Sequence, residues 1–165
     1  MELVDKLEKY LQKNFEKPRF GRMSYKNLME MGEASYSCSS EDINTFIEKN
    51  KDKHNFQQLL FSYIDDKNLK DSDVYNKVNI DRRLFSKIRS NINYHPSKDT
   101  VILLCIALNL NEDEAVELLD SASYTLPKNN VFDLIIRYCF IEHIYDINTI
   151  NDYLYSYNCK LLGQN

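Results

Sequence analysis

The stretch Leu69–Arg89 constrains the fold of this chain more than any other part of its sequence. In its first half, Val74 and Val78 lie four residues apart and share one face of a short helix. In its second half, three apolar residues share a face in the same way: Leu84, Phe85 and Ile88. Between the halves lies Asn79, which accepts a positive φ more readily than most residues with a side chain. The pattern predicts two short amphipathic helices joined by a tight turn.

Asp81 stands where the second of these helices should begin. Its carboxylate can accept hydrogen bonds from the backbone N–H groups that the first turn of a helix exposes, as an N-cap residue does. Two short helices joined by such a turn form a helix-turn-helix. We therefore expect residues 69–89 to adopt this motif.

Apolar residues at helical spacing also occur before and after the motif. Residues 98–108 are apolar nearly all round, which predicts a helix at the buried centre, and residues 112–121 begin with acids, which suit a helix N-terminus. Only three Gly and three Pro interrupt the chain, which favours helices over a many-turned β fold. The predicted fold class is all-α. Upstream of the motif, apolar residues recur every three or four positions: Phe56, Leu59, Leu60, Tyr63 and Ile64.

From about residue 56 to residue 120 the chain resembles the Cro and lambda-repressor type of helix-turn-helix protein, the XRE family. The turn and the second helix carry the resemblance through Val74, Asn79, Ile80, Asp81 and Ser86-Lys87-Ile88. Two further segments are similar to the start of the family's fourth helix and to the junction with its fifth: Pro96–Thr100 and Ala107–Ala115. The resemblance implies a lambda-repressor-like five-helix bundle that binds DNA.

The N-terminal part of the chain, residues 1–52, differs in character from the bundle. Residues 2–14 carry one apolar stripe opposite charged residues, which predicts a helix that docks on the body of the protein or on a partner. Residues 15–40 are punctuated by Pro and Gly and are interpreted as a linker, or as an arm that binds DNA, a partner or another subunit. A short helix over residues 41–49, with preceding serines as caps, should follow.

The bundle is expected over residues 53–126, followed by a C-terminal helical extension over residues 127–165. Asn130 can cap a helix over residues 131–143, and a second helix is predicted over residues 147–157. Both are too apolar to stand alone, so they pack on the bundle, form a homodimer face, or both. Three segments resemble a bacterial variant of the family that has two extra C-terminal helices and also occurs attached to signalling domains: Phe132–Ile136, Tyr145–Ile147 and Leu161–Gly163.

Basic residues concentrate around the helix-turn-helix although the whole chain is acidic. The net charge is −4 and the pI is about 5.4, which does not suggest bulk nucleic-acid binding. Between Lys67 and Lys98, however, eight Lys or Arg stand against three Asp, a local balance of +5. The local sign of charge matters more than the total for a docking face.

The resemblance implies roles for these basic residues. Arg82, Arg83 and Lys87 lie where the family's recognition helix meets the major groove, and Arg reads guanine there through two parallel hydrogen bonds. Ser86 can face the DNA backbone or a base. Three residues lie where the family's following loop contacts phosphates: Asn93, His95 and Lys98. The alternative interpretation is a solvated basic face on a short helix.

Two positions depart from the family's pattern. Asp71, followed by Asp73, stands where the family commonly has Gln. Acidic side chains repel phosphates, although they also suit a helix N-terminus. Tyr75 stands where the family has a small Ala, so we expect it to change the crossing of the two helices or to point outward.

The sequence holds no pattern typical of catalysis or metal binding. It has no Gly-rich phosphate loop, no G-x-S-x-G and no H-E-x-x-H, and its three His lie far apart. Its four Cys form no C-x-x-C pair, and Cys105 and Cys139 should be buried in apolar helices. We predict a protein that is not an enzyme and needs no metal or cofactor.

We expect no contact with a membrane, since the polar face of the helix predicted over residues 2–14 carries charges of both signs. Glu2, Asp5 and Glu8 interrupt the N-terminus where a signal peptide would be apolar, and the longest apolar run, Val101–Leu108, is too short to span a bilayer. We expect a cytoplasmic protein.

Two functions remain. The first is a DNA-binding transcriptional regulator, dimeric, that acts on double-stranded DNA. The second is a non-enzymatic protein-interaction module of a bacterial signalling or phage-defence pathway, which keeps the bundle without DNA binding. The basic segment favours the first, and Asp71 and Tyr75 favour the second.

Overall fold

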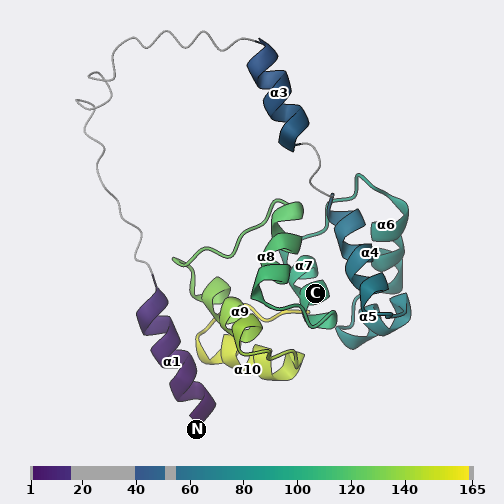
Figure 1. The fold of residues 1–165 in the computed structure, drawn as a ribbon. Coiled ribbons are helices and arrows are strands. Elements are labelled where there is room, and N and C mark those ends of the chain that lie inside the picture. The colour runs from purple at the N-terminus through teal and green to yellow at the C-terminus, as the bar shows by residue number, and fades with distance from the viewer. Residues whose placement is uncertain (1, 16–39, 51–54, 164–165) are drawn as a thin grey trace, which may run out of the picture. The chain divides into compact units, whose positions relative to one another are not determined.

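All regular structure in the described part of the chain is helical. The computed structural model describes residues 2–15, 40–50 and 55–163 (Figure 1). The predicted all-α class is confirmed for these residues, and none of their helices is both long and apolar enough to cross a membrane. The chain divides into two units, residues 17–53 and the remainder.

The smaller unit contains α3 (Ser40–Asn50). A helix was predicted here, and it is confirmed. The side chains of its apolar face are exposed: Ile43, Phe46 and Ile47. The predicted linker, its alternative as a binding arm, and Cys38 all fall outside the described residues.

The larger unit contains α1 (Glu2–Asn14), α4 (Phe56–Asp66), α5 (Asp71–Lys77), α6 (Arg82–Ser90), α7 (Lys98–Ala107), α8 (Glu112–Ser121), α9 (Val131–Ile141) and α10 (Ile147–Ser156). The predicted bounds of α1 and α7–α10 agree with these to within two residues. Polar side chains cap the N-termini of α4 and of α6–α10, each accepting a hydrogen bond from a first-turn N–H: Asn55, Asp81, Ser97, Asn111, Asn130 and Asp146. The caps predicted at Asp81 and Asn130 are confirmed.

One kind of C-terminal cap recurs along the larger unit. After α4, α5 and α7–α10, the second residue beyond the helix is left-handed, with φ between 50° and 59°: Asn68, Asn79, Asn109, Ser123, His143 and Asn158. The next residue then bonds back to the last turn, as the Ile80 N–H does to the Tyr75 carbonyl oxygen at 2.9 Å. Asn often takes the place that Gly usually has in this motif, which explains how a chain with three Gly ends its helices sharply. The positive φ predicted at Asn79 is confirmed, and the one at His143 ends α9 two residues before the predicted boundary.

α7 lies at the centre of the larger unit, as its sequence predicted. Its residues Val101–Ala107 are all buried, and α7 contacts α5 and α8, while α4 contacts α8 (Figure 1). On α8, Ala115, Leu118 and Leu119 are buried and Val116 is half-buried.

The apolar side chains of α9 pack against other helices of the same chain. α9 contacts α1, α8 and α10, and its side chains from Phe132 to Phe140 are buried except for Arg137. On α1, Leu7 and Leu11 are buried, and the ring centroid of Tyr10 lies 5.2 Å from that of Tyr138. The N-terminal helix therefore docks on the C-terminal extension.

Ion pairs reinforce the attachment of this extension. Lys98 of α7 contacts Asp133 of α9 at 2.5 Å, and the Asp133 side chain is 3% exposed. Two further pairs join α9 to α8 and the C-terminal segment to α7: Arg137 with Glu112 at 2.5 Å, and Lys160 with Asp99 at 2.7 Å.

Candidate nucleic-acid interface

The turn between α5 and α6 determines where α6 begins and which of its faces is buried. Val78 and Ile80 on either side of the left-handed Asn79 are buried, and the Asp81 carboxylate accepts from the Arg83 N–H at 2.6 Å. Phe85 and Ile88 then dock α6 on the core, and Leu84 is half-buried. The predicted inner face is thus confirmed.

The C-terminus of α6 is held by a side chain of α4 that the sequence did not indicate. Gln57 Nε2 donates to the carbonyl oxygens of Ile88 at 2.9 Å and Arg89 at 2.5 Å. Carbonyl groups at the end of a helix lack partners within the helix, so this amide satisfies two of them. Both ends of α6 are therefore fixed by polar side chains.

The outer face of α6 is basic and exposed. Arg82, Arg83, Ser86 and Lys87 are all exposed, as expected for the predicted interface. Among the described residues, neither Arg82 nor Arg83 forms an ion pair with a carboxylate. The Lys87 ammonium lies 4.4 Å from the ring centroid of Tyr94, a cation–π contact that leaves its hydrogen-bond donors available.

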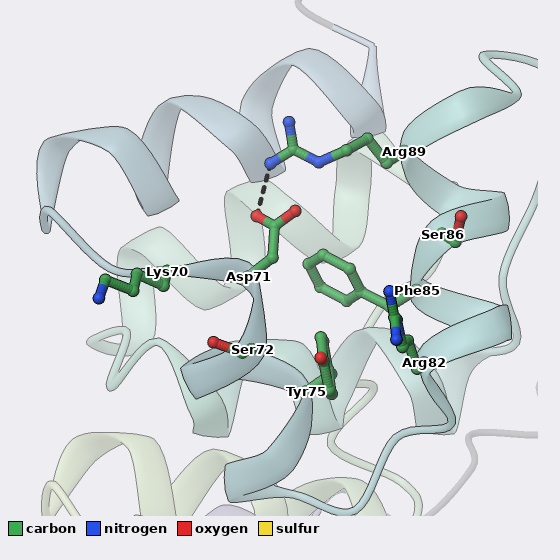
Figure 2. A pocket seen from close by; sticks show the side chains of 8 residues that line it. All are labelled: Lys70, Asp71, Ser72, Tyr75, Arg82, Phe85, Ser86 and Arg89. Atoms are coloured by element: carbon green, nitrogen blue, oxygen red, sulfur yellow. Dashed lines mark hydrogen bonds and ion pairs between the residues drawn. The ribbon is translucent and has the colours of Figure 1, made fainter.

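A hollow of about 420 Å³ lies between α5 and α6. It is lined by residues from both helices and from the residue just before α5: Lys70, Asp71, Ser72, Tyr75, Arg82, Phe85, Ser86 and Arg89 (Figure 2). Three of these side chains are cationic and one, Asp71, is anionic. The hollow therefore continues the basic face of α6 toward the start of α5.

Inside the hollow, Asp71 and Arg89 form an ion pair. Asp71 Oδ1 lies 2.5 Å from Arg89 Nη2 (Figure 2). The Arg89 guanidinium also lies over the Phe61 ring, with Cζ 4.1 Å from the ring centroid. Asp71 thus neutralises one of the cations of this face.

Tyr75 is half-buried against the second helix. Its ring centroid lies 5.6 Å from that of Phe85, and its side chain lines the hollow (Figure 2). A Tyr therefore fits between the two helices and is not fully displaced into solvent.

The three predicted phosphate-contacting residues beyond α6 lie in different surroundings. Asn93 is exposed, and its N–H donates to Asn91 Oδ1 at 3.0 Å. His95 Nε2 donates to the Ala122 carbonyl oxygen at 2.8 Å, which ties the loop to the end of α8. Lys98 is paired with the buried Asp133. The structure brings Arg82, Arg83, Ser86 and Lys87 together on one helix, while His95 and Lys98 have partners elsewhere in the chain.

Sequence reasoning did not select Arg89, Lys70 or Ser72 for the site. Arg89 follows Arg82 by seven residues, which is two helical turns, so helical spacing could have placed both on one side of α6. No comparable signal indicates Lys70 and Ser72, because the packing of α5 on α6 brings them to the hollow.

The described residues offer no metal cluster of three or more His, Cys, Asp or Glu. Burial raises the pKa of the Cys139 thiol to about 12 and also raises the pKa of Cys105. These thiols are protonated at neutral pH, and a protonated thiol is a poor nucleophile.

Comparisons with family models, curated proteins and solved structures gave no match for this chain.

Proposed function

We propose that this chain is a helix-turn-helix DNA-binding transcriptional regulator. In this proposal α4–α8 form a lambda-repressor-like five-helix bundle, α5 and α6 are the helix-turn-helix, and α6 is the recognition helix. The left-handed Asn79 between two short helices and the capping Asp81 support this reading of the motif.

One observation carries the proposal. The outer face of α6 presents Arg82, Arg83 and Lys87 to solvent, and neither Arg is engaged by a carboxylate among the described residues. Exposed Arg side chains on a short helix can enter the major groove and bind guanine through two hydrogen bonds. The rest of the chain is acidic overall, which favours approach to DNA through this face alone.

Each residue of the face has a role in this proposal. Arg82 and Arg83 read bases, Ser86 donates to a base or a phosphate, and Lys87 neutralises a phosphate. Asn93, exposed in the following loop, remains available for a phosphate contact. Lys98 and His95 are not part of the proposed interface, because Lys98 forms an ion pair with Asp133 and His95 donates a hydrogen bond to the Ala122 carbonyl oxygen.

The test is selection of duplexes from a random-sequence pool by the full chain, beside the Arg82→Ala/Arg83→Ala variant. Lys9→Ala/Lys128→Ala is the matched control, because it removes the same charge from exposed residues on other segments. The proposal expects one enriched motif with the wild type and the control, and none with the α6 variant. Failure to retain any duplex at low salt would contradict it.

The Asp71–Arg89 pair favours a second candidate function. By neutralising a cation on the proposed DNA face, the pair suits a bundle that binds protein instead, as a non-enzymatic module of a signalling or defence pathway. The same selection separates the two, since an interaction module enriches no duplex.

A further inference from the structure

The hollow between α5 and α6 has the composition of an anion site. Arg82 and Arg89 line it from two successive turns of α6 with Ser86 between them. Lys70 and Ser72 line it from the start of α5, with their polar ends directed away from the Asp71–Arg89 pair (Figure 2). Arg guanidinium groups that line one hollow can donate hydrogen bonds to the oxygen atoms of a phosphate. Asp71 is the one carboxylate among the residues that line the hollow.

Asp71 occupies Arg89 in the way that a phosphate oxygen would. The contact between Asp71 Oδ1 and Arg89 Nη2 measures 2.5 Å, and the two side chains are 36% and 50% exposed. The pair is therefore open to solvent, where an ion pair adds little to folding stability. The Arg89 guanidinium also lies over the Phe61 ring, with Cζ 4.1 Å from the ring centroid, a contact that does not involve Asp71.

From this geometry we infer that Asp71 is a built-in competitor of the ligand: it occupies Arg89 and lowers the affinity of the hollow for the phosphate groups of duplex DNA. The inference rests on the proposed function and adds a regulation of the same site. Binding must displace the Asp71 carboxylate from Arg89 and overcome its repulsion of the phosphate. Replacing Asp71 by Asn keeps the size of the side chain and removes both obstacles.

The first arm of the test uses inorganic phosphate and requires no DNA. The backbone N–H signals of the residues that line the hollow are followed by NMR in the full chain during a phosphate titration of the wild type, Asp71→Asn and Asp73→Asn. Asp73 is the matched control, since it is an exposed carboxylate on the same helix that does not line the hollow. We expect Asp71→Asn to bind phosphate about fivefold more tightly than the wild type, and Asp73→Asn to differ by less than about twofold, because an exposed ion pair and one nearby charge have effects of this size.

Equal affinities in Asp71→Asn and Asp73→Asn would overturn the inference, because the effect would then be one of net charge alone. A second variant guards against that explanation. In Asp71→Asn/Arg89→Gln the gain in phosphate affinity should disappear. A gain in phosphate affinity that persists without Arg89 would also overturn the inference.

The second arm repeats the comparison with duplex DNA over a salt series. Asp71→Asn should bind more tightly than Asp73→Asn and should steepen the dependence of log K on log salt by about one, as one added phosphate contact does. Tighter phosphate binding without any duplex binding would uphold the role of Asp71 in the hollow and refute the proposed function. Duplex binding that Asp71→Asn leaves unchanged would uphold the proposed function and refute the inference.

Discussion

Two groups of basic side chains in this molecule have different surroundings. Lys98, Arg137 and Lys160 each contact a carboxylate on another segment and join the C-terminal extension to the bundle. Arg82 and Arg83 on α6 face solvent and, within the described ranges, pair with no acid. The two groups differ in whether an anion lies nearby. Lysines and arginines beside a carboxylate hold the fold together, whereas those without one are free to contact a ligand, and the spacing of residues in the sequence does not reveal which is which.

Arg89 lies between the two groups. It belongs to α6 and lines the hollow, yet it is paired with Asp71. If the proposed function holds, this pairing makes Asp71 the residue through which the affinity of the proposed binding face can be changed.

The largest effect on stability is expected from Lys98→Met. The change leaves the Asp133 carboxylate, 3% exposed, without its cation, and an uncompensated buried charge costs about 3 kcal/mol of unfolding free energy. Urea denaturation measures the loss. If Lys98 belongs to the structural group, duplex affinity stays unchanged under conditions where the variant is folded. Reduced affinity with unchanged stability would move Lys98 into the binding group.

Arg82→Ala and Arg83→Ala test the other group. Each should weaken binding to the selected duplex by about tenfold or more, since a good Arg–guanine contact contributes about 1–3 kcal/mol. Each should change the unfolding free energy by less than about 0.5 kcal/mol, because neither side chain packs in the core. Binding is measured by fluorescence anisotropy and stability by urea denaturation. A loss of stability that accompanies the loss of binding would mean that the two groups do not differ as described.

Asp81→Ala removes the N-cap of α6 but leaves the basic side chains of this helix in place. Loss of the hydrogen bond from the Arg83 N–H should cost about 1 kcal/mol of unfolding free energy. Asp81→Asn is the matched control, because Asn caps a helix nearly as well. The capping role is wrong if both variants are equally destabilised in thermal unfolding.

The smallest effect is expected from Lys160→Met. Its pair with Asp99 is exposed, with 62% of the Lys160 side chain accessible, so its loss should cost less than about 1 kcal/mol. Denaturation at low and at high salt should show that the difference from the wild type shrinks as salt screens the pair. A cost equal to that of Lys98→Met would show that burial does not set the strength of these pairs.

Local chemistry allowed parts of this fold to be predicted from sequence. A short polar residue between apolar groups indicated the left-handed Asn79, and an acid at a helix start indicated the Asp81 cap. The same signal was present at Asn109 and Asn158, which also adopt positive φ, as does Asn68 after Lys67. Ser123 and His143 adopt it too, but neither residue type is diagnostic of that conformation.

The partners of the charged side chains could not be predicted in this way. Asp71 is 18 residues from Arg89, and Lys98 is 35 residues from Asp133. Helical periodicity places a residue on a face of its own helix but does not say which other helix covers that face. The exposure of Arg82, Arg83 and Lys87 was therefore predictable, while the removal of Lys98 from the basic face was not.

The most direct test of the central claim is the salt dependence of duplex binding by the full chain, measured beside Arg82→Ala/Arg83→Ala and Lys98→Met. The claim predicts that the slope of log K against log salt becomes shallower by up to about two in the α6 variant, because each Arg that also neutralises a phosphate contributes about one. It also predicts that the affinity of this variant for the duplex falls about a hundredfold. It predicts wild-type slope and affinity for Lys98→Met. Equal binding by all three proteins, or no binding at low salt, would contradict it.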